Sequence, residues 1–312
     1  MISLISFQRR IRASLSIFYS RPETENLKIK RIIERTHKFL LNNIDSRGIE
    51  KKKTHKIFSY EIFKLIKNKK LLNFLQNSNI QKIFFIHNRL FLLKYFVNLY
   101  FSENWLLWKK LLIENNVGNP VRYFLIPFTS GNKIFQAYHL KKYQDKMRIN
   151  LKNFDFIFEF GGGYGNMALN FNILNKKSKY FIFDTFEVSL LQYYYLSRMD
   201  LKPNLNTNKL NQINLFYSIE MLRKNLKKFK GKKKLFIANW SFSEIPLSLR
   251  KKLKFIFDEF DFQIISFQNN FEGINNLRYF KNINSFNETK KRNSTILGVD
   301  NYKDNCYLFS KK

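Results

Sequence analysis

The chain has 312 residues, of which 45% are hydrophobic and 17% aromatic, so it can bury a sizeable core and global disorder is excluded. Lys and Arg number 56 against 23 Asp and Glu, which gives a formal net charge of +33. This charge predicts attraction to a polyanion such as RNA, DNA or an anionic membrane surface. Codon bias is the competing explanation, because Lys, Asn, Ile and Phe are abundant together and the lysine runs are scattered along the chain.

The cysteine and histidine content argues against several kinds of site. A single cysteine, Cys306, excludes an internal disulfide and a cysteine-based zinc site. The four histidines are dispersed without metal-ligand spacing, so no metal site is expected. The longest apolar stretch, 83–101, is interrupted by polar residues that include His87 and Lys94, which predicts a buried amphipathic helix and no membrane span. With no clean apolar signal core, we expect a cytoplasmic protein.

Residues 1–150 are predicted to form a helical N-terminal domain. Apolar residues recur at helical spacing in segments that are separated by turn-forming residues such as Gly118-Asn119-Pro120. The expected helices span 22–42, 60–76, 80–100, 103–114 and 133–147. No internal repeat is visible in this half of the chain.

Residues 151–312 are predicted to form a second domain of α/β class. Short apolar strands alternate with helical segments, which is typical of a parallel sheet with crossover helices. The expected strands are 155–160, 179–184, 213–217, 235–240 and 262–267, and the runs 295–299 and 306–309 are expected to close the sheet as an antiparallel pair.

A glycine-rich loop follows the first of these strands. The strand carries Glu159 and is followed by Gly161, Gly162, Gly163, Tyr164 and Gly165 before a helical segment. Glycines let a backbone adopt unusual angles and approach a ligand closely. The dinucleotide-binding pattern G-x-G-x-x-G fails, because Asn166 takes the place of its third glycine. An acidic residue followed by G-x-G-x-G instead resembles the first motif of class I S-adenosylmethionine (SAM)-dependent methyltransferases; a plain tight turn is the alternative.

A second carboxylate ends the next predicted strand, 25 residues after Glu159. An acid at this position can accept hydrogen bonds from both hydroxyls of a ribose, as it does in dinucleotide sites. Asp184 could instead cap the helix that begins near Thr185. The neighbouring glycine loop favours the ribose role.

Polar residues also follow the fourth and fifth predicted strands. The fourth strand ends in Asn239 and Trp240, which Ser241 and Glu244 follow, and Gln268 and Asn269 come after the fifth. Ligands of open α/β sheets bind beyond the carboxyl ends of the strands, so we expect these groups near one site.

Several motifs together resemble the bacterial sugar O-methyltransferase family. The segments Glu159–Gly165, Phe183–Ser197, Trp240–Glu244 and Phe267–Asn276 carry the resemblance, which covers about 118–310. The family implies a Rossmann-like, seven-stranded class I methyltransferase sheet, with the third strand at one edge and the last between the fifth and sixth. It also implies SAM as cofactor and methyl transfer to a hydroxyl of a sugar or glycan precursor. Cofactor binding would fall to Glu159, Gly161, Gly162, Gly163, Tyr164, Gly165, Asp184, Thr185, Asn239 and Trp240.

Methylation of a hydroxyl calls for a base, because a neutral hydroxyl is a poor nucleophile. Glu244 is the first candidate because it follows strand four, although it could instead cap the helix near Pro246. His139 is the second, although a lone histidine is more often structural. Ser241, Gln268 and Asn269 are candidate hydrogen-bonding partners of the acceptor. The helical domain would then act as a cap that recognises the acceptor.

Two other functions compete with sugar methylation. The charge and the aromatic residues suggest an RNA methyltransferase, but the Asn/Asp-Pro-Pro-Tyr motif of base-methylating enzymes is absent after strand four, where Asn239-Trp240-Ser241-Phe242 stands. A non-catalytic, basic nucleic-acid-binding protein on a methyltransferase fold is the other alternative. The intact glycine loop and its two acids argue against it.

Overall fold

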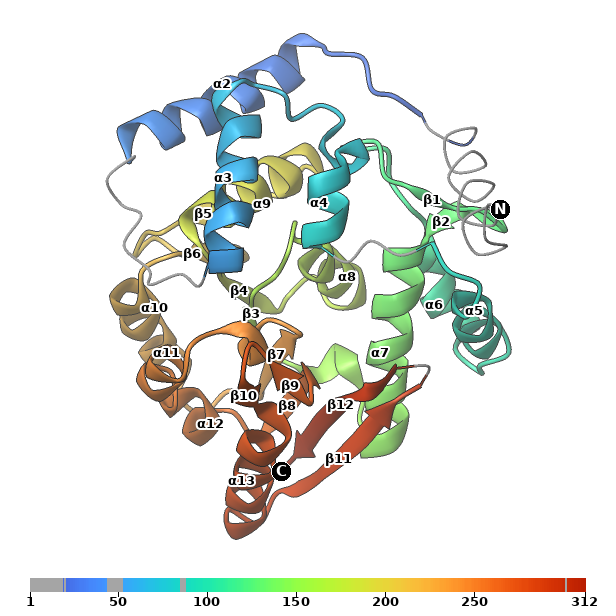
Figure 1. Cartoon of the computed structure of the whole chain (residues 1–312), viewed down its shortest axis with the longest axis vertical. Helices are drawn as coiled ribbons and strands as arrows, with labels where there is room; N and C mark the ends of the chain where they lie inside the picture. Colours follow the sequence, from blue (N-terminus) through green and yellow to red (C-terminus); the bar gives the residue numbers. More distant parts are fainter. Residues whose placement is uncertain (1–18, 20, 44–52, 85–87, 301) are drawn as a thin grey trace. The chain divides into compact units, whose positions relative to one another are not determined.

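The computed structural model describes the chain except residues 1–18, 20, 44–52, 85–87 and 301 (Figure 1). The chain divides into two compact units. Unit 1 comprises Met1–Asn42 and Phe58–Lys142, and unit 2 comprises Asn43–Ile57 and Tyr143–Lys312. Of the predicted apolar stretch 83–101, the part that contains His87 lies outside the described residues. No described helix combines the length and the apolar character that crossing a bilayer requires.

Unit 1 is mostly helical. The helix predicted over 133–147 begins earlier, at Gly131, whereas the helices before residue 115 are shorter than the sequence pattern predicts. The helices are α2 (Leu27–Asn42), α3 (Lys53–Lys67), η1 (Phe74–Gln76), α4 (Ser78–Ile83), α5 (Leu92–Tyr100), α6 (Trp105–Leu112) and α7 (Gly131–Met147). The predicted helix 60–76 stops at Lys67, just before Lys69, which has a positive φ of 56°. A new helix then starts where the Asn77 side chain accepts hydrogen bonds from the backbone N–H groups of Asn79 and Ile80.

A short hairpin in unit 1 was not predicted. Strands β1 (Arg122–Tyr123) and β2 (Ile126–Ser130) pair antiparallel directly before α7. Their sequence, with Pro127 inside β2, gives little strand signal, since proline removes a backbone donor. The sequence pattern predicts a break between helices here.

Unit 2 is built around one mixed sheet with the strand order β11-β12-β8-β7-β3-β4-β6-β5. The strands are β3 (Phe156–Phe160), β4 (Lys179–Phe183), β5 (Asn204–Leu205), β6 (Ile213–Phe216), β7 (Lys234–Asn239), β8 (Phe262–Gln268), β11 (Asn293–Val299) and β12 (Tyr302–Lys311). Strand β12 lies antiparallel between β8 and β11, and the others from β8 to β5 are parallel. The sheet is therefore Rossmann-like, with the last strand inserted as the class I methyltransferase arrangement requires.

The sheet has eight strands, so the expected number of seven is wrong. The additional strand, β5, has two residues and pairs parallel with β6 at the edge. It follows Pro203 and begins with Asn204, so it lacks the β-branched or aromatic run that marks a strand in sequence. The third predicted strand, β6, is thus one position in from the edge.

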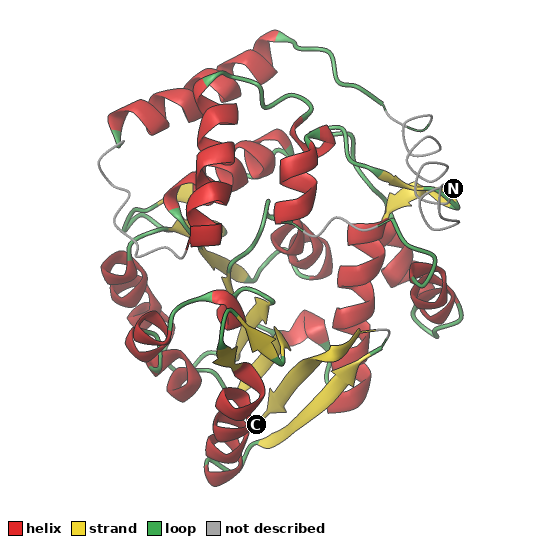
Figure 2. Cartoon of the chain, in the orientation of Figure 1, coloured by secondary structure: helices red, strands yellow, loops and turns green. Residues whose placement is uncertain are grey.

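Helices alternate with strands through most of unit 2 (Figure 2). They are η2 (Leu151–Asn153), α8 (Asn166–Leu174), α9 (Phe186–Arg198), α10 (Ile219–Leu226), η3 (Lys227–Phe229), η4 (Phe242–Glu244), α11 (Leu247–Lys252), α12 (Phe255–Glu259) and α13 (Asn276–Thr289). The small hairpin of β9 (Asn270–Phe271) and β10 (Ile274–Asn275) precedes α13. The helix expected near Pro246 is α11, and α12 follows it after a short break.

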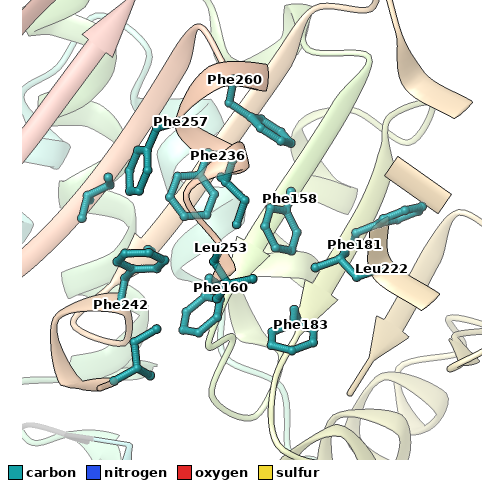
Figure 3. Packing of buried hydrophobic residues seen from close by; sticks show 14 of the residues in the cluster. Phe158, Phe160, Phe181, Phe183, Leu222, Phe236, Phe242, Leu253, Phe257 and Phe260 are labelled. Carbon is teal, nitrogen blue, oxygen red and sulfur yellow. The ribbon is translucent and has the colours of Figure 1, made fainter. Parts of the chain in front are cut away.

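Aromatic side chains fill the core on one face of this sheet (Figure 3). Phe236 on β7 is fully buried, and its ring centroid lies 5.6 Å from that of Phe158 on β3 and 6.0 Å from that of Phe257 on α12. Successive residues of a strand point to opposite faces. Glu159, next to Phe158, therefore points away from this core, toward the opposite face of the sheet.

Candidate functional site

The predicted site residues of unit 2 follow neighbouring parallel strands at one edge of the sheet. Phe160 pairs with Phe183, so the glycine loop and Asp184 leave β3 and β4 side by side. The backbone N–H of Gly161 donates to the Phe183 carbonyl at 2.9 Å. Strand β7 lies on the other side of β3 and ends at Asn239. Asn239 pairs with Ser266 of β8, near the end of that strand at Gln268. The register thus brings the ends of strands one, two, four and five to the same edge.

The glycine loop leaves no room for side chains at two positions. Gly161 has a φ of +70°, and a Cβ added there would lie 2.2 Å from the Cβ of Ser241. Gly162 needs its small size for another reason, because a Cβ would lie 2.7 Å from Cγ2 of Ile182 and 2.9 Å from Oε2 of Glu159. The loop is closed by a hydrogen bond of 3.0 Å from the N–H of Gly165 to the carbonyl of Gly162. Its backbone is therefore in contact with both neighbouring strand ends.

A glutamine on α9 joins the loop to the second carboxylate. Gln192 is fully buried, and its Nε2 donates to the carbonyl of Gly163 at 2.9 Å and to Oδ2 of Asp184 at 3.0 Å. The other oxygen of Asp184, Oδ1, accepts the backbone N–H of Thr185 at 2.8 Å. Gln192 is not among the site residues that the sequence predicts. The available signal was a single amide within the apolar and aromatic run 190–196.

Helix α9 also packs on the loop through its apolar side chains. The ring of Tyr195 meets that of Tyr164 edge to face, with centroids 4.9 Å apart. A Cβ at Gly165 would approach Cγ of Leu196 to 3.2 Å. Tyr164, predicted as a cofactor contact, is thus a buried packing residue of the loop.

Three buried oxygen atoms near the start of α9 have no hydrogen-bond partner in the described part of the chain. They are Oγ1 of Thr185, Oγ of Ser189 and Oε1 of Gln192. Buried polar groups in folded proteins are almost always hydrogen-bonded to protein, water or ligand. These atoms lie on the first two turns of the helix that follows Asp184, which fits a polar ligand at this end of the sheet.

The first carboxylate, Glu159, is held in a nearly dry environment. Its side chain is 3% exposed, and its Oε2 accepts the hydroxyl of Tyr180 at 2.9 Å. Burial is the main cause that raises the pKa of Glu159 to about 8; the hydrogen bond from Tyr180 opposes this shift, and the negative charge of Asp184 adds to it. The carboxyl group of Glu159 is therefore mostly neutral at pH 7, and the negative charge of Asp184 favours this neutral form.

The residues after strand four are bound to the sheet. Asn239 Oδ1 accepts the Ser266 hydroxyl at 3.0 Å, and the N–H of Trp240 donates to the Ser266 carbonyl at 2.8 Å. Trp240 has a positive φ of 65°. Ser241, a predicted acceptor-binding residue, donates its hydroxyl to the carbonyl of Phe160 and lies against Gly161. In this structure Ser241 joins strand four to the glycine loop.

Glu244 lies beside strand five. Its Oε1 accepts the Nε2 of Gln268 at 2.9 Å, while Oε1 of Gln268 lies 2.7 Å from the hydroxyl of Ser243. Helix α11 begins after Pro246 without a side-chain hydrogen bond at its cap. The amide of Gln268, predicted to bind an acceptor, therefore orients Glu244 and Ser243.

A buried arginine holds the backbone on either side of Glu244. Arg250 is fully buried, and its Nη2 and Nε donate to the carbonyls of Ser243 at 2.7 Å and Ile245 at 3.2 Å. Its guanidinium carbon lies 4.8 Å from the ring centroid of Tyr279. Burial lowers the pKa of Arg250 to about 10, so it remains a cation at neutral pH. The short helix η4, which ends in Glu244, is thus fixed through its carbonyl groups.

Two further predicted residues have structural contacts of their own. His139 belongs to unit 1, where it is buried in α7 with its ring 4.0 Å from that of Phe135. Asn269 follows Gln268, but its Oδ1 lies 3.3 Å from Sγ of Cys306 and its carbonyl accepts the N–H of Asn276. Within the described residues, no group of three or more His, Cys, Asp or Glu side chains could hold a metal ion.

Comparisons with known proteins give structural likenesses without sequence relatives. No family model and no curated protein matches the chain. Similar solved structures include an rRNA methylase from Streptococcus thermophilus (12% identity, 56% of this chain and 95% of that one, TM-score 0.38). An O-methyltransferase family protein from Burkholderia thailandensis has 8% identity, with 58% and 60% coverage and a TM-score of 0.38. An SAH-bound methyltransferase from Podospora anserina has 12% identity, with 58% and 79% coverage and a TM-score of 0.35. Since these TM-scores are low, the fold assignment rests on the strand order itself.

The close approach at Gly161 can be separated from its backbone conformation. Gly231 has nearly the same φ, +73°, but nothing lies within 4 Å of an added Cβ. Gly231→Ala should therefore cost about 1 kcal/mol of unfolding free energy, from backbone strain alone. Gly161→Ala should cost about 3 kcal/mol or more, because steric overlap with Ser241 is added. Urea unfolding measures both, and Ser241→Gly should restore part of the loss in Gly161→Ala. Equal losses at the two glycines would contradict the close contact.

The raised pKa of Glu159 predicts a pH dependence of stability. Between pH 4.5, the ordinary pKa, and about 8, the folded chain binds a proton that the unfolded chain has released. This contribution to stability is complete below pH 4.5 and is lost as the pH rises to about 8, by about 1.4 kcal/mol per pH unit. Glu159→Gln keeps an acceptor for Tyr180 and removes the effect. The stability difference between variant and wild type should therefore shift in favour of the variant from pH 5 to pH 8.

Urea unfolding at several pH values in this range tests the effect. The exposed Glu288→Gln serves as control and should follow the wild-type profile. Parallel profiles for wild type and Glu159→Gln would show that Glu159 ionises normally in the folded protein.

Proposed function

We propose that the chain is a SAM-dependent methyltransferase that transfers a methyl group to a hydroxyl of a sugar or glycan precursor. The observation that carries this proposal is the link from the glycine loop to Asp184 through Gln192, at the carboxyl edge of a sheet with an inserted antiparallel last strand. The polar groups at this edge have the chemistry that binding of the cofactor requires. SAM supplies an electrophilic methyl group on a sulfonium.

The cofactor half of the site uses the glycine loop and Asp184. Gly161 and Gly162 let the loop pack closely against Ser241 and against Ile182 and Glu159, which holds its backbone at the strand ends, where we assign it to SAM. An ionised carboxylate has about four lone-pair positions. Asp184 therefore retains acceptor capacity for ribose hydroxyls beyond its hydrogen bonds to Thr185 and Gln192. The buried oxygens of Thr185 and Ser189 can accept or donate further hydrogen bonds in this region.

The acceptor half uses the segment after strand four. Glu244 is the proposed base, which takes the proton of the acceptor hydroxyl as that oxygen attacks. Gln268 orients its carboxylate, and the amide–carboxylate hydrogen bond limits the rotation of both side chains. Positioning of this kind is what makes a general base effective. His139 remains the second candidate base, and unit 1 is the proposed acceptor-recognition part.

Cofactor binding is the first expected outcome. Wild-type protein should bind SAM and its demethylated product in calorimetry. Asp184→Ala should weaken binding about 10- to 100-fold, because each hydrogen bond to a charged group contributes about 1.5–3 kcal/mol. Gln192→Leu should weaken binding less, about fivefold or more, because Asp184 remains but loses an orienting partner. Circular dichroism and thermal melting establish that each variant is folded.

The matched control is Asp258→Ala, which removes an exposed carboxylate of α12. It should bind as wild type does. Failure of the folded wild-type protein to bind either ligand would refute the methyltransferase proposal and favour a basic binding protein on this fold.

Methyl transfer is the second expected outcome. With radiolabelled SAM and a panel of sugars, sugar nucleotides and RNA, label should appear on a sugar hydroxyl. Glu244→Gln should lower kcat about 10²- to 10⁴-fold, the usual contribution of a general base, with SAM affinity unchanged. Glu220→Gln, at an exposed position of α10, is the control. Label on RNA alone would replace the sugar acceptor with RNA and leave the cofactor site intact.

A further inference from the structure

Unit 1 exposes an apolar surface on α5, α6 and the β1–β2 hairpin. Its most prominent members, here called the apolar patch, are Val97, Tyr100, Phe101, Leu106, Ile113 and Phe128. Phe101 is 79% exposed and Leu106 is 75% exposed, which are high values for such large side chains. Scattered exposed apolar residues need no explanation, but a contiguous patch marks a site of interaction.

Ring contacts show that the patch is contiguous. The ring centroid of Tyr100 lies 5.1 Å from that of Phe101 and 4.9 Å from that of Trp105. The half-buried Phe96 links this pair to Phe128, at 6.2 Å. The backbone N–H of Glu114 donates to the carbonyl of Phe128 at 2.9 Å, which brings the end of α6 to the same strand. Figure 1 shows α5 and α6 as neighbours.

Helix α6 itself combines apolar and basic residues on its exposed face. This face carries four exposed residues, each three or four positions from another: Leu106, Lys109, Lys110 and Ile113. Positions three and four apart are neighbours on a helix surface. The two lysines therefore stand between two exposed aliphatic side chains, where their stems can lie along apolar surface while their charges reach a polar layer.

The charge around the patch is positive. Between residues 89 and 128, the exposed charged residues are Arg89, Lys94, Lys109 and Lys110 against the single acid Glu103. None of these four cations forms an ion pair with a described residue. Exposed aromatic and aliphatic side chains mixed with unpaired lysines match the chemistry of an anionic bilayer surface, where apolar groups enter the acyl boundary and lysines meet the headgroups.

We propose that the apolar patch binds unit 1 to the surface of a membrane that contains anionic phospholipids. Phe101 and Leu106 would enter the interface, and Lys109 and Lys110 would contact the headgroups. Helices α5 and α6 have nine and eight residues, about 13 Å each, so they lie in the interface and do not cross the apolar layer of about 30 Å. Pairing of two patches in a symmetric dimer is disfavoured, because the same cations would face one another.

Vesicle co-sedimentation tests the proposal with the full chain. The probes are vesicles of phosphatidylcholine alone and of phosphatidylcholine with about one third phosphatidylglycerol. Wild-type protein should bind the mixed vesicles at least tenfold more tightly, because each lysine near an anionic surface adds about fivefold in affinity. Lys109→Gln with Lys110→Gln should therefore reduce binding about 25-fold. Phe101→Ser with Leu106→Ser should reduce it tenfold or more and should leave the residual binding more sensitive to salt.

The matched control is Leu27→Ser. Leu27 is 76% exposed at the start of α2. The variant therefore removes an equally exposed leucine that lies outside the patch. It should bind as wild type does. All of these sites are exposed, so the variants should melt as wild type does.

Two results would overturn the proposal. One such result is that replacing the two lysines reduces vesicle binding while Phe101→Ser with Leu106→Ser leaves it unchanged. Binding would then be nonspecific attraction of a basic protein. A dimer in size-exclusion chromatography with light scattering that the Phe101 and Leu106 variant converts to monomer, without vesicle binding by either, would assign the patch to a second copy of the chain. Membrane binding does not require methyl transfer, so loss of SAM binding would leave the expected result unchanged.

Discussion

The side-chain amide of Gln192 is the interaction on which the proposed cofactor site depends. A single nitrogen donates to the carbonyl of Gly163 and to the carboxylate of Asp184, which leave two different strands. The amide is fully buried, so breaking either hydrogen bond would leave a polar group without water. Because Tyr195 and Leu196 of the same helix also pack on the loop, α9 fixes both the shape of the loop and the direction of the acid. One helix thereby determines the geometry at the ends of strands one and two.

Strand β3 gives the sheet two chemically different faces. Phe156, Phe158 and Phe160 join an aromatic core on one face, and the intervening Glu159 points to the other. A carboxyl group is tolerated in such a place because its raised pKa leaves it neutral and Tyr180 supplies a hydrogen bond. A cationic ligand bound beside Glu159 would favour the ionised form of this carboxyl group, which would then release a proton. The buried acid therefore couples the charge of a ligand to the protonation of the site.

The features that were predicted from sequence have strong local signals. Alternating strands and helices, the glycine loop and the acid after β4 are each specified within a few residues. The strand order follows from the resemblance except at the edge, where β5 adds an eighth strand beside β6. The features that were missed depend on contacts between distant segments. Gln192 looks like one more helical residue until the fold brings Gly163 and Asp184 to it. Strand β5 and the β1–β2 hairpin are too short for strand propensity to identify. They form through backbone hydrogen bonds to a neighbouring strand, which the local sequence does not indicate.

The surroundings of Glu244 limit how an acceptor can be recognised. Ser241, Gln268 and Asn269 already hydrogen-bond to Phe160, to Glu244 and to Cys306, so their polar groups contribute to the internal structure of this edge. The buried Arg250 fixes the carbonyls of Ser243 and Ile245 on either side of Glu244. Moving Glu244 would therefore disturb β8 and α11 together. If Glu244 acts as the proposed base, a carboxylate held in this way would favour one acceptor geometry, and the proposed selection among hydroxyls would depend on which of them reaches it.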